Sequence, residues 1–179
     1  MSDVVLDGEL CRVRSYRAGD VDALAVLAAD PLVSRWMTAG FPHPYTRADA
    51  AAFVAIATAG DMPQHFAIEV DGAYAGGAGL LALAGEHRGV AQFGYWLGRR
   101  YWGRGIATDA ARTLSRYGLR TAGFRRLEAT VFAPNRASAH VLEKAGFTLE
   151  ARLRESYLER DGTVCDGLLY ARLATDPEP

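Results

Sequence analysis

The residues best suited to chemistry lie in one stretch, 98–105, which combines three arginines with three glycines. Arginine carries a permanent positive charge, and glycine has no Cβ atom, so an anion can approach the backbone closely. A helix is expected directly afterwards, because apolar residues recur at helical spacing between Ile106 and Gly118. The first amide groups of a helix lack intrahelical partners and lie at the positive end of its dipole. We therefore predict a pyrophosphate site in this loop, formed by Arg99, Arg100, Gly103, Arg104 and Gly105.

The elements that must position this loop form a mixed α/β pattern. Alternating or apolar runs predict strands over residues 10–14, 65–70, 73–83, 90–97, 126–132, 147–157 and 163–173. Helical spacing and cap residues such as Asp20 and Thr46 predict helices over 20–29, 32–37, 47–58, 104–120 and 135–146. The order predicts a single domain over residues 1–179, with a mostly antiparallel central sheet flanked by helices. The end from Thr175 onward is expected to fray.

Composition narrows the function classes. The chain has 179 residues, is 50% hydrophobic and carries a net charge of −1, so no basic excess favours nucleic-acid binding. Cys11 and Cys165 have no metal-ligand spacing and fit a reducing compartment. The start shows no secretory signal pattern, and no run reaches the roughly 18 apolar residues of a membrane span. We expect a cytoplasmic protein without a metal site, a nucleic-acid partner or a membrane partner.

Three segments, in order, point to one family. The first is Arg100-x-x-Gly103-x-Gly105, and the second runs from Val131 through Asn135 and Ser138 to Gly146-Phe147. The third is the ending, with Arg154-Glu155, Asp161-Gly162, Asp166 and Tyr170. Together they resemble the GCN5-related N-acetyltransferase superfamily, and more narrowly its RimJ/RimL-like branch of ribosomal-protein-alanine acetyltransferases. The resemblance covers nearly the whole chain.

The resemblance implies that acetyl-CoA is the donor substrate. In that family, the strands ending at Leu97 and near Phe132 splay apart, and the pantetheine arm lies in the gap. The amides from Arg104 to Thr108 would hold the pyrophosphate, and Asn135 would bind the pantetheine arm. Besides the loop residues, the implied cofactor-binding set includes Leu97, Ile106, Ala107, Thr108, Val131, Asn135, Ser138 and Lys144. Arg136 and Lys144 are candidates for the adenosine 3′-phosphate, with a solvated helix face as the equal alternative.

Acyl transfer to an amine requires a neutral amine, a stabilised oxyanion and a protonated leaving thiolate. The resemblance assigns the oxyanion to the backbone amide near Leu97. Ser138 is the first candidate for protonating the thiolate, and Tyr157 competes with it. The general base stays open, because Gln92 stands where the family often has glutamate. A carboxylate elsewhere or solvent would have to act, and strands carry five such carboxylates: Glu69, Glu128, Glu150, Glu155 and Asp166.

The acceptor is open as well. The family expectation is the N-terminal α-amine of a protein, including a ribosomal one, attacked directly in a ternary complex. A small-molecule amine or an antibiotic is compatible, and so is a catalytically silent acetyl-CoA-binding regulator. A dinucleotide-binding oxidoreductase is disfavoured, since Thr108 stands where the third glycine or alanine of that fingerprint is needed. By analogy with the family, a homodimer is plausible.

Overall fold

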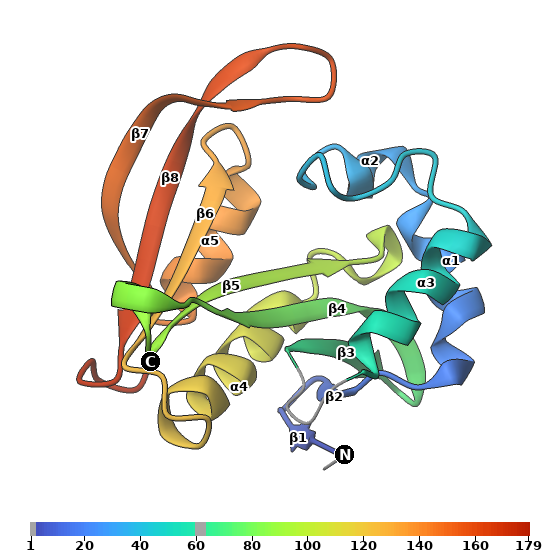
Figure 1. The fold of residues 1–179 in the computed structure, drawn as a ribbon, viewed down its shortest axis with the longest axis horizontal. Helices are drawn as coiled ribbons and strands as arrows, with labels where there is room; N and C mark the ends of the chain where they lie inside the picture. Colours follow the sequence, from blue (N-terminus) through green and yellow to red (C-terminus); the bar gives the residue numbers. More distant parts are fainter. Residues whose placement is uncertain (1–2, 60–63) are drawn as a thin grey trace.

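The central sheet is mixed and mostly antiparallel. The computed structural model describes residues 3–59 and 64–179, and eight strands in this part form one sheet in the order β1-β2-β3-β4-β5-β6-β8-β7 (Figure 1). Their bounds are Val5–Asp7, Arg12–Ser15, His65–Val70, Ala73–Ala82, Val90–Leu97, Arg126–Phe132, Thr148–Leu158 and Val164–Leu173 for β1 to β8. Among neighbouring strands of the described residues, only β5 and β6 run parallel. The expected fold class is confirmed.

Helices cover both faces of the sheet. They are α1 Val21–Ala28, α2 Pro31–Ser34, α3 Arg47–Ala57, α4 Ile106–Arg120 and α5 Arg136–Lys144. Side chains alternate between faces along β3, so Phe66 packs on Tyr117 of α4 while His65 packs on Phe53 of α3. Phe93 of β5 packs on Phe147, directly after α5, which places α4 and α5 on one face and α3 on the other. Within residues 3–59 and 64–179, no helix is long and apolar enough to cross a membrane.

Strands β5 and β6 separate soon after they begin. Their ladder contains the pairs from Val90↔Arg126 to Gln92↔Glu128 and then stops. Strand β5 nevertheless stays paired with β4 as far as Leu97, and β6 stays paired with β8 as far as Phe132. The two strands therefore diverge into a V, which we call the split, as the resemblance led us to expect. Figure 1 shows β5 and β6 leaving one point in different directions.

Several local expectations near the start of the chain differ from the structure, and the helix expected over 32–37 ends at Ser34. The first predicted strand begins at Arg12 rather than Leu10 and pairs with β1, a strand too short to show a pattern. Asp20 does not cap α1 with its side chain. Its carboxylate instead accepts bonds of 2.7 and 2.8 Å from the buried Arg14 guanidinium, because a buried cation needs a paired anion. Thr46 does cap α3, in a reciprocal capping box with Asp49.

The end of the chain is docked rather than frayed. The Glu178 carboxylate accepts a 2.9 Å bond from Arg172, whose side chain is 1% exposed. Arg116 and Arg120 of α4 also lie within 4 Å of this carboxylate, so these two arginines have a partner on their helix face. A buried guanidinium left without an anion would be costly, and this explains why the terminal segment packs back onto α4.

Candidate functional site

The loop between β5 and α4 has the backbone of an anion site. Gly103 and Gly105 adopt φ values of 70° and 79°, a conformation that favours glycine. A Cβ atom on Gly103 would meet open space, so the backbone there is freely approachable. Helix α4 begins at Ile106, directly after the loop as expected and without a side-chain cap, so the range 104–120 started two residues too early. The amides of Ile106, Ala107 and Thr108 therefore start the helix with no intrahelical partner.

Asp109, in the first turn of α4, holds the β1–β2 turn against this loop. Its carboxylate accepts backbone N–H bonds from Glu9, Leu10 and Cys11, at 3.0, 2.8 and 3.0 Å. These bonds engage a negative charge that would otherwise compete with a bound anion at the helix start. Burial, reinforced by Asp109, raises the pKa of the Cys11 thiol well above its usual range. Cys11 is thus a packed, unreactive group.

The three arginines of the loop differ in their surroundings. All three side chains are exposed. Arg100 lies over its neighbour Tyr101, 4.9 Å from the ring centre, and donates a 2.9 Å bond to that phenol oxygen. Trp102 donates a 2.8 Å bond from its indole nitrogen to the carbonyl of Leu97. Aromatic residues of the loop itself therefore close it, and its three arginines are exposed where an anion could approach.

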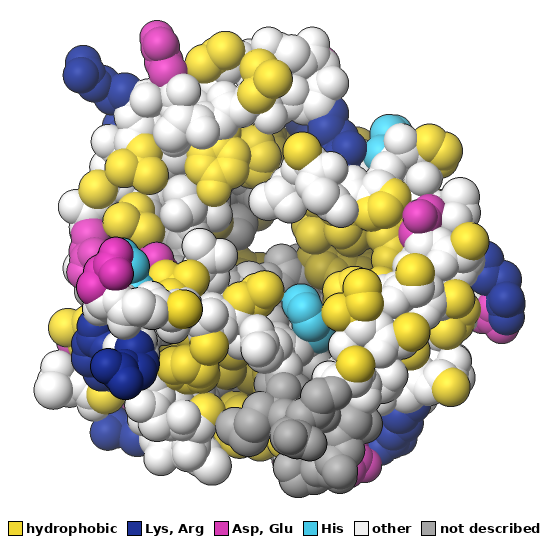
Figure 2. All heavy atoms as spheres, in the orientation of Figure 1, with side chains coloured by type: hydrophobic (Ala, Val, Ile, Leu, Met, Phe, Trp, Pro, Cys, Tyr) yellow, Lys and Arg dark blue, Asp and Glu magenta, His cyan; other side chains and the backbone are white. Residues whose placement is uncertain are grey.

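Backbone groups of β5 point into the split. Gly98 donates to the carbonyl of Ala75 in β4, at 2.9 Å, so even-numbered residues of β5 bond to β4. The odd-numbered residues Tyr95 and Leu97 point the other way, toward β6, beyond the last rung of the β5–β6 ladder. The carbonyl of Leu97 is occupied by Trp102, and its N–H is directed into the split. Figure 2 shows the surface hollowed where β5 and β6 diverge in Figure 1, with apolar side chains around the hollow.

Ser138 lies at the α5 side of the split and meets a residue that the sequence had not singled out. Its hydroxyl oxygen lies 2.9 Å from the phenol oxygen of Tyr95, which also donates to its backbone carbonyl at 3.1 Å. Burial raises the pKa of Tyr95 to about 12. Asn135, the residue predicted to bind the pantetheine arm, accepts a 3.2 Å bond from the Ser138 N–H and caps α5. The alternation of β5, which places Tyr95 beside Leu97, was the available signal for Tyr95.

Tyr157, the other candidate acid, lies elsewhere. Its ring packs on Phe132 with centroids 4.5 Å apart, and burial raises its pKa. Leu127 faces α4, near Gly118, so the alternation of β6 turns Phe132 to the opposite face. There Phe132 packs on Trp36, with ring centroids 5.9 Å apart. The structure therefore pairs Ser138 with Tyr95 on one face and places Tyr157 in an aromatic group on the other.

The candidate bases are mostly engaged in ion pairs. Gln92 is exposed beside Glu128 on the last rung of the β5–β6 ladder. The Arg126 guanidinium binds both Glu128, at 3.2 Å, and Glu150, and it lowers the pKa of Glu150. Two further candidate carboxylates form ion pairs as well, Glu69 with Arg14 and Asp166 with Arg152. No arrangement among the described residues singles out one carboxylate as a base.

The remaining predicted cofactor residues lie on β6 and α5. Val131 is half-buried near the end of β6, and Lys144 is exposed in the last turn of α5. The carbonyl of Lys144 accepts bonds of 3.0 and 2.8 Å from Arg112 of α4. Arg112 therefore ties the two helices together and holds the Lys144 end of α5 close to α4.

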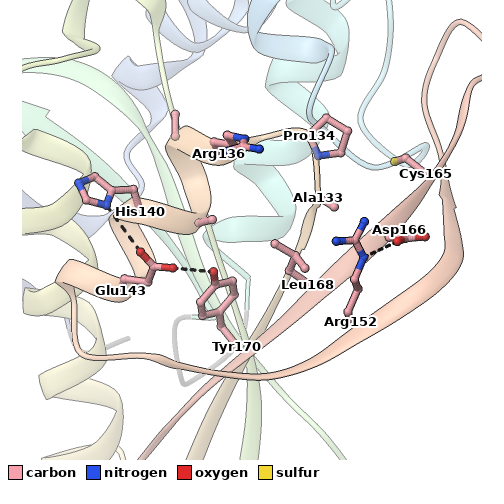
Figure 3. A pocket seen from close by; sticks show the side chains of 12 residues that line it. Ala133, Pro134, Arg136, His140, Glu143, Arg152, Cys165, Asp166, Leu168 and Tyr170 are labelled. Carbon is pink, nitrogen blue, oxygen red and sulfur yellow. Dashed lines mark hydrogen bonds and ion pairs between the residues drawn. The ribbon is translucent and has the colours of Figure 1, made fainter.

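A pocket of about 960 Å³ is lined by residues of α5 on one side and of β7 and β8 on the other (Figure 3). Arg136, His140 and Glu143 recur at helical spacing and line it, whereas Ser138 projects from another side of the helix. Its polar groups engage one another: Glu143 accepts a 3.0 Å bond from Tyr170, and Arg152 pairs with Asp166. Arg136 therefore faces this pocket. Across residues 3–59 and 64–179, no group of three His, Cys, Asp or Glu residues is placed to hold a metal.

Comparison with known proteins agrees with this geometry. Residues 11–148 match the acetyltransferase (GNAT) domain family. The chain is 36% identical over 96 residues to the uncharacterized N-acetyltransferase YoaA of Bacillus subtilis, covering 54% of this chain and 53% of YoaA. It is 30% identical over 123 residues to spermidine N(1)-acetyltransferase of Escherichia coli K12, covering 65% and 63%.

A solved structure extends the likeness over nearly the whole chain. Mycobacterium smegmatis RimJ, in complex with CoA-disulfide, superposes with a TM-score of 0.81 at 28% identity, covering 96% of this chain and 87% of RimJ. The sequence matches are shorter, and the chain spans about half the length of the first curated relatives. The family match covers most of the chain and includes β5, the loop and α4. The chain therefore belongs to the GNAT acetyltransferase family.

Proposed function

We propose that this protein is an acetyl-CoA-dependent N-acetyltransferase that transfers an acetyl group to a primary amine by direct attack in a ternary complex. The observation that carries the proposal is the split between β5 and β6, which opens beside the glycine loop at the start of α4. A long thioester with a pyrophosphate needs both features at once. Residues 1–179 would act as one catalytic domain.

The residues present suit acetyl-CoA. The amides of Ile106, Ala107 and Thr108, with Arg99, Arg100 and Arg104 nearby, would hold the pyrophosphate. Backbone groups of β5 and β6, beyond their last shared rung, offer the hydrogen bonds that the pantetheine arm can use as a strand does. Bound acetyl-CoA supplies an activated acyl group with a thiolate leaving group. Val131, Asn135 and Lys144 complete the proposed binding set.

The chain's own groups would then meet the needs of the transfer. The N–H of Leu97 points into the split and would stabilise negative charge on the thioester oxygen. The Ser138 hydroxyl, oriented by Tyr95, would protonate the departing sulfur. Tyr157 stays the second candidate for that proton. Positioning supplies much of the rate in such a reaction, up to about 7–11 kcal/mol in ideal cases.

For the acceptor, we propose the α-amine of a protein N-terminus, as in the RimJ/RimL-like branch. An α-amine has a pKa of about 8, so a useful fraction is neutral without a strong base, whereas a lysine amine has a pKa near 10.4. This suits a site in which Gln92 cannot accept a proton and the neighbouring carboxylates are paired. The relationship to spermidine N(1)-acetyltransferase supports a small linear amine as the second candidate.

The proposal is tested by measuring acetyl-CoA binding by calorimetry and then free thiol release with a panel of N-terminal peptides, spermidine and antibiotics. We expect binding and turnover with at least one amine. Absence of acetyl-CoA binding would end the assignment of the loop and the split. Binding without turnover on any amine would identify a regulatory module instead. A homodimer is proposed by analogy and is checked by light scattering on the same sample.

A further inference from the structure

The open end of the split is bridged by a segment far away in sequence. Residues 34–41, which we call the crossbar, connect α2 to the loop before α3. On the β6 side, Trp36 of the crossbar packs on Phe132, with ring centroids 5.9 Å apart. On the β5 side, Phe41 packs on Trp96, also at 5.9 Å. The crossbar therefore reaches from one arm of the split to the other.

The crossbar is fastened by the tip of the β7–β8 hairpin. The Arg160 guanidinium donates to the backbone carbonyls of Ser34, Thr38 and Phe41, at 2.7, 3.3 and 2.6 Å. The Ser34 carbonyl, at the end of α2, also accepts a 3.1 Å bond from the Met37 N–H, so Arg160 is its second donor. One side chain thus holds both ends of the crossbar.

A second contact reinforces the first. Arg35 of the crossbar lies 3.4 Å from the Glu159 carboxylate, whose side chain is 6% exposed. Glu159 is adjacent to Arg160 in the hairpin, and the two residues contact Arg35 and Ser34, which are adjacent in the crossbar. We call Arg35, Glu159 and Arg160 the latch. Opening would leave the buried Glu159 carboxylate without the Arg35 guanidinium and would break the three hydrogen bonds that Arg160 donates. The latch therefore favours the closed state.

With the latch closed, the split has a complete rim. Starting at the Gln92↔Glu128 rung, the rim follows β5 to Trp96, crosses through Phe41 and Trp36, and returns along β6 from Phe132. The crossbar lies on the face opposite α4 and α5, and the loop proposed for the pyrophosphate belongs to the α4 side. An amine that approaches from the crossbar face must therefore pass through the opening inside this rim, which carries the aromatic rings of Trp36, Phe41, Trp96 and Phe132.

We propose that the latch, with Arg160 as its principal residue, determines acceptor specificity by keeping this opening narrow. The acceptor class that fits is a primary amine at the end of an unbranched chain, whether a peptide α-amine or a linear polyamine. Polycyclic amines with branched rings are excluded. The proposal rests on the proposed function, because it names the acceptor of that same site.

The first test needs no acceptor. Hydrogen exchange of peptides covering residues 34–41 is compared in the wild type, Arg160→Ala and Arg154→Ala. Arg154 is a matched control, since it is an exposed arginine of β7 whose side chain makes no hydrogen bond among the described residues. We expect exchange of the crossbar to rise about tenfold in R160A only, because opening exposes its amides. Equal exchange in R160A and R154A would overturn the latch.

The second test measures kcat/KM for Ala-Ala-Ala, spermidine and kanamycin. The two linear amines distinguish the peptide and polyamine sources, and kanamycin is the branched probe. The quantity compared is the ratio of kcat/KM for kanamycin to kcat/KM for the better linear amine. We expect this ratio to rise at least about tenfold in R160A and to stay unchanged in R154A. Arg35→Ala, which leaves Arg160 in place, should change the ratio in the same direction by less, and it serves if R160A folds poorly.

Two outcomes overturn the specificity claim: efficient kanamycin acetylation by the wild type, or an unchanged ratio in R160A despite faster crossbar exchange. Failure of the proposed function looks different, because no amine would then be acetylated by any variant although acetyl-CoA binds. In that case the claim about acceptors falls with the function, and hydrogen exchange still decides whether the latch exists.

Discussion

The phenol oxygen of Tyr95, on the strand that also carries Leu97, lies 2.9 Å from the hydroxyl oxygen of Ser138 on α5. The phenol hydrogen has two acceptors within reach, the hydroxyl oxygen and the backbone carbonyl of Ser138. A carbonyl oxygen only accepts, so when Tyr95 donates there, the phenol oxygen can accept the Ser138 hydroxyl proton. When Tyr95 donates to the hydroxyl instead, the Ser138 proton is free to point elsewhere. Tyr95 thus sets the direction of the Ser138 proton.

Replacement of Tyr95 by phenylalanine should therefore lower kcat/KM more than it weakens cofactor binding. We expect a fall of about tenfold, equal to the loss of one oriented hydrogen bond, with the KM for acetyl-CoA within about twofold of the wild type. Ser138→Ala should cost a similar factor. The double variant Y95F/S138A should be no slower than S138A, because two residues that act together are not additive. Independent, multiplying losses would show that Tyr95 does not act through Ser138.

The glycine loop gives a sharper test of the cofactor site. Gly105→Asp places a negative charge at the start of α4, where we propose that the pyrophosphate binds. Gly123 has the same φ of 79° and open space around a Cβ atom. Gly123→Asp therefore causes the same backbone strain as Gly105→Asp, but away from the start of α4. We expect G105D to lose at least about a hundredfold in acetyl-CoA affinity, or about 2.7 kcal/mol, while G123D binds normally. Calorimetry and thermal unfolding measure both variants, and surviving affinity in folded G105D would contradict the assignment.

The parts of the site that the sequence predicted are those with local signals. The strand–loop–helix unit around Gly103 and Gly105 follows from glycine placement, apolar alternation and helical spacing within about 30 residues. The Asn135 start of α5 likewise follows from a residue that caps its own helix. Each of these features depends on neighbours in sequence, and each element lies within two residues of its expected bounds.

Contacts between distant elements could not be predicted in this way. The Tyr95–Ser138 pair spans 43 residues, and the Arg160 contact with Ser34 spans 126. In sequence, Tyr95 fits an ordinary core aromatic and Arg160 an ordinary turn residue, because only the packed sheet brings their partners near. The docking of Glu178 beside Arg116 and Arg120 of α4 has the same cause, since a polar chain end has no pattern that identifies distant arginines as its partners.

Gln92 is predicted to affect binding and not proton transfer. Its amide cannot accept a proton at neutral pH, and it is exposed beside Glu128 at the base of the split. Gln92→Ala should raise the KM of the acceptor while the apparent pKa values in the kcat/KM profile stay where the wild type has them. Rate measurements from pH 6 to about pH 10 check this, a range in which Tyr95, with a pKa of about 12, stays protonated. An ionisation lost from the profile of Q92A would show that this view of Gln92 is wrong.

The Glu178 contact predicts a pH-dependent contribution to stability. Arg172, whose bond to Glu178 is the main cause, lowers the pKa of this carboxyl below its ordinary value of 4.5. A carboxyl with a lowered pKa stabilises the folded state above the unfolded-state value, and the gain disappears as the pH falls through the folded-state value. Because the Glu178 side chain is 43% exposed, solvent screening limits the gain to about 1 kcal/mol at pH 7.

Glu178→Gln should therefore lower the Tm by about 2–4 °C at pH 7, and the difference from the wild type should shrink steadily below pH 4.5. Glu86→Gln is the matched control, since the Glu86 side chain is 88% exposed and lies 3.9 Å from His87. The Tm of that variant should equal the Tm of the wild type at every pH. Thermal unfolding at a series of pH values measures all three proteins. A difference between E178Q and the wild type that persists unchanged to pH 2 would mean that Glu178 acts through packing, with the ion pair to Arg172 contributing nothing.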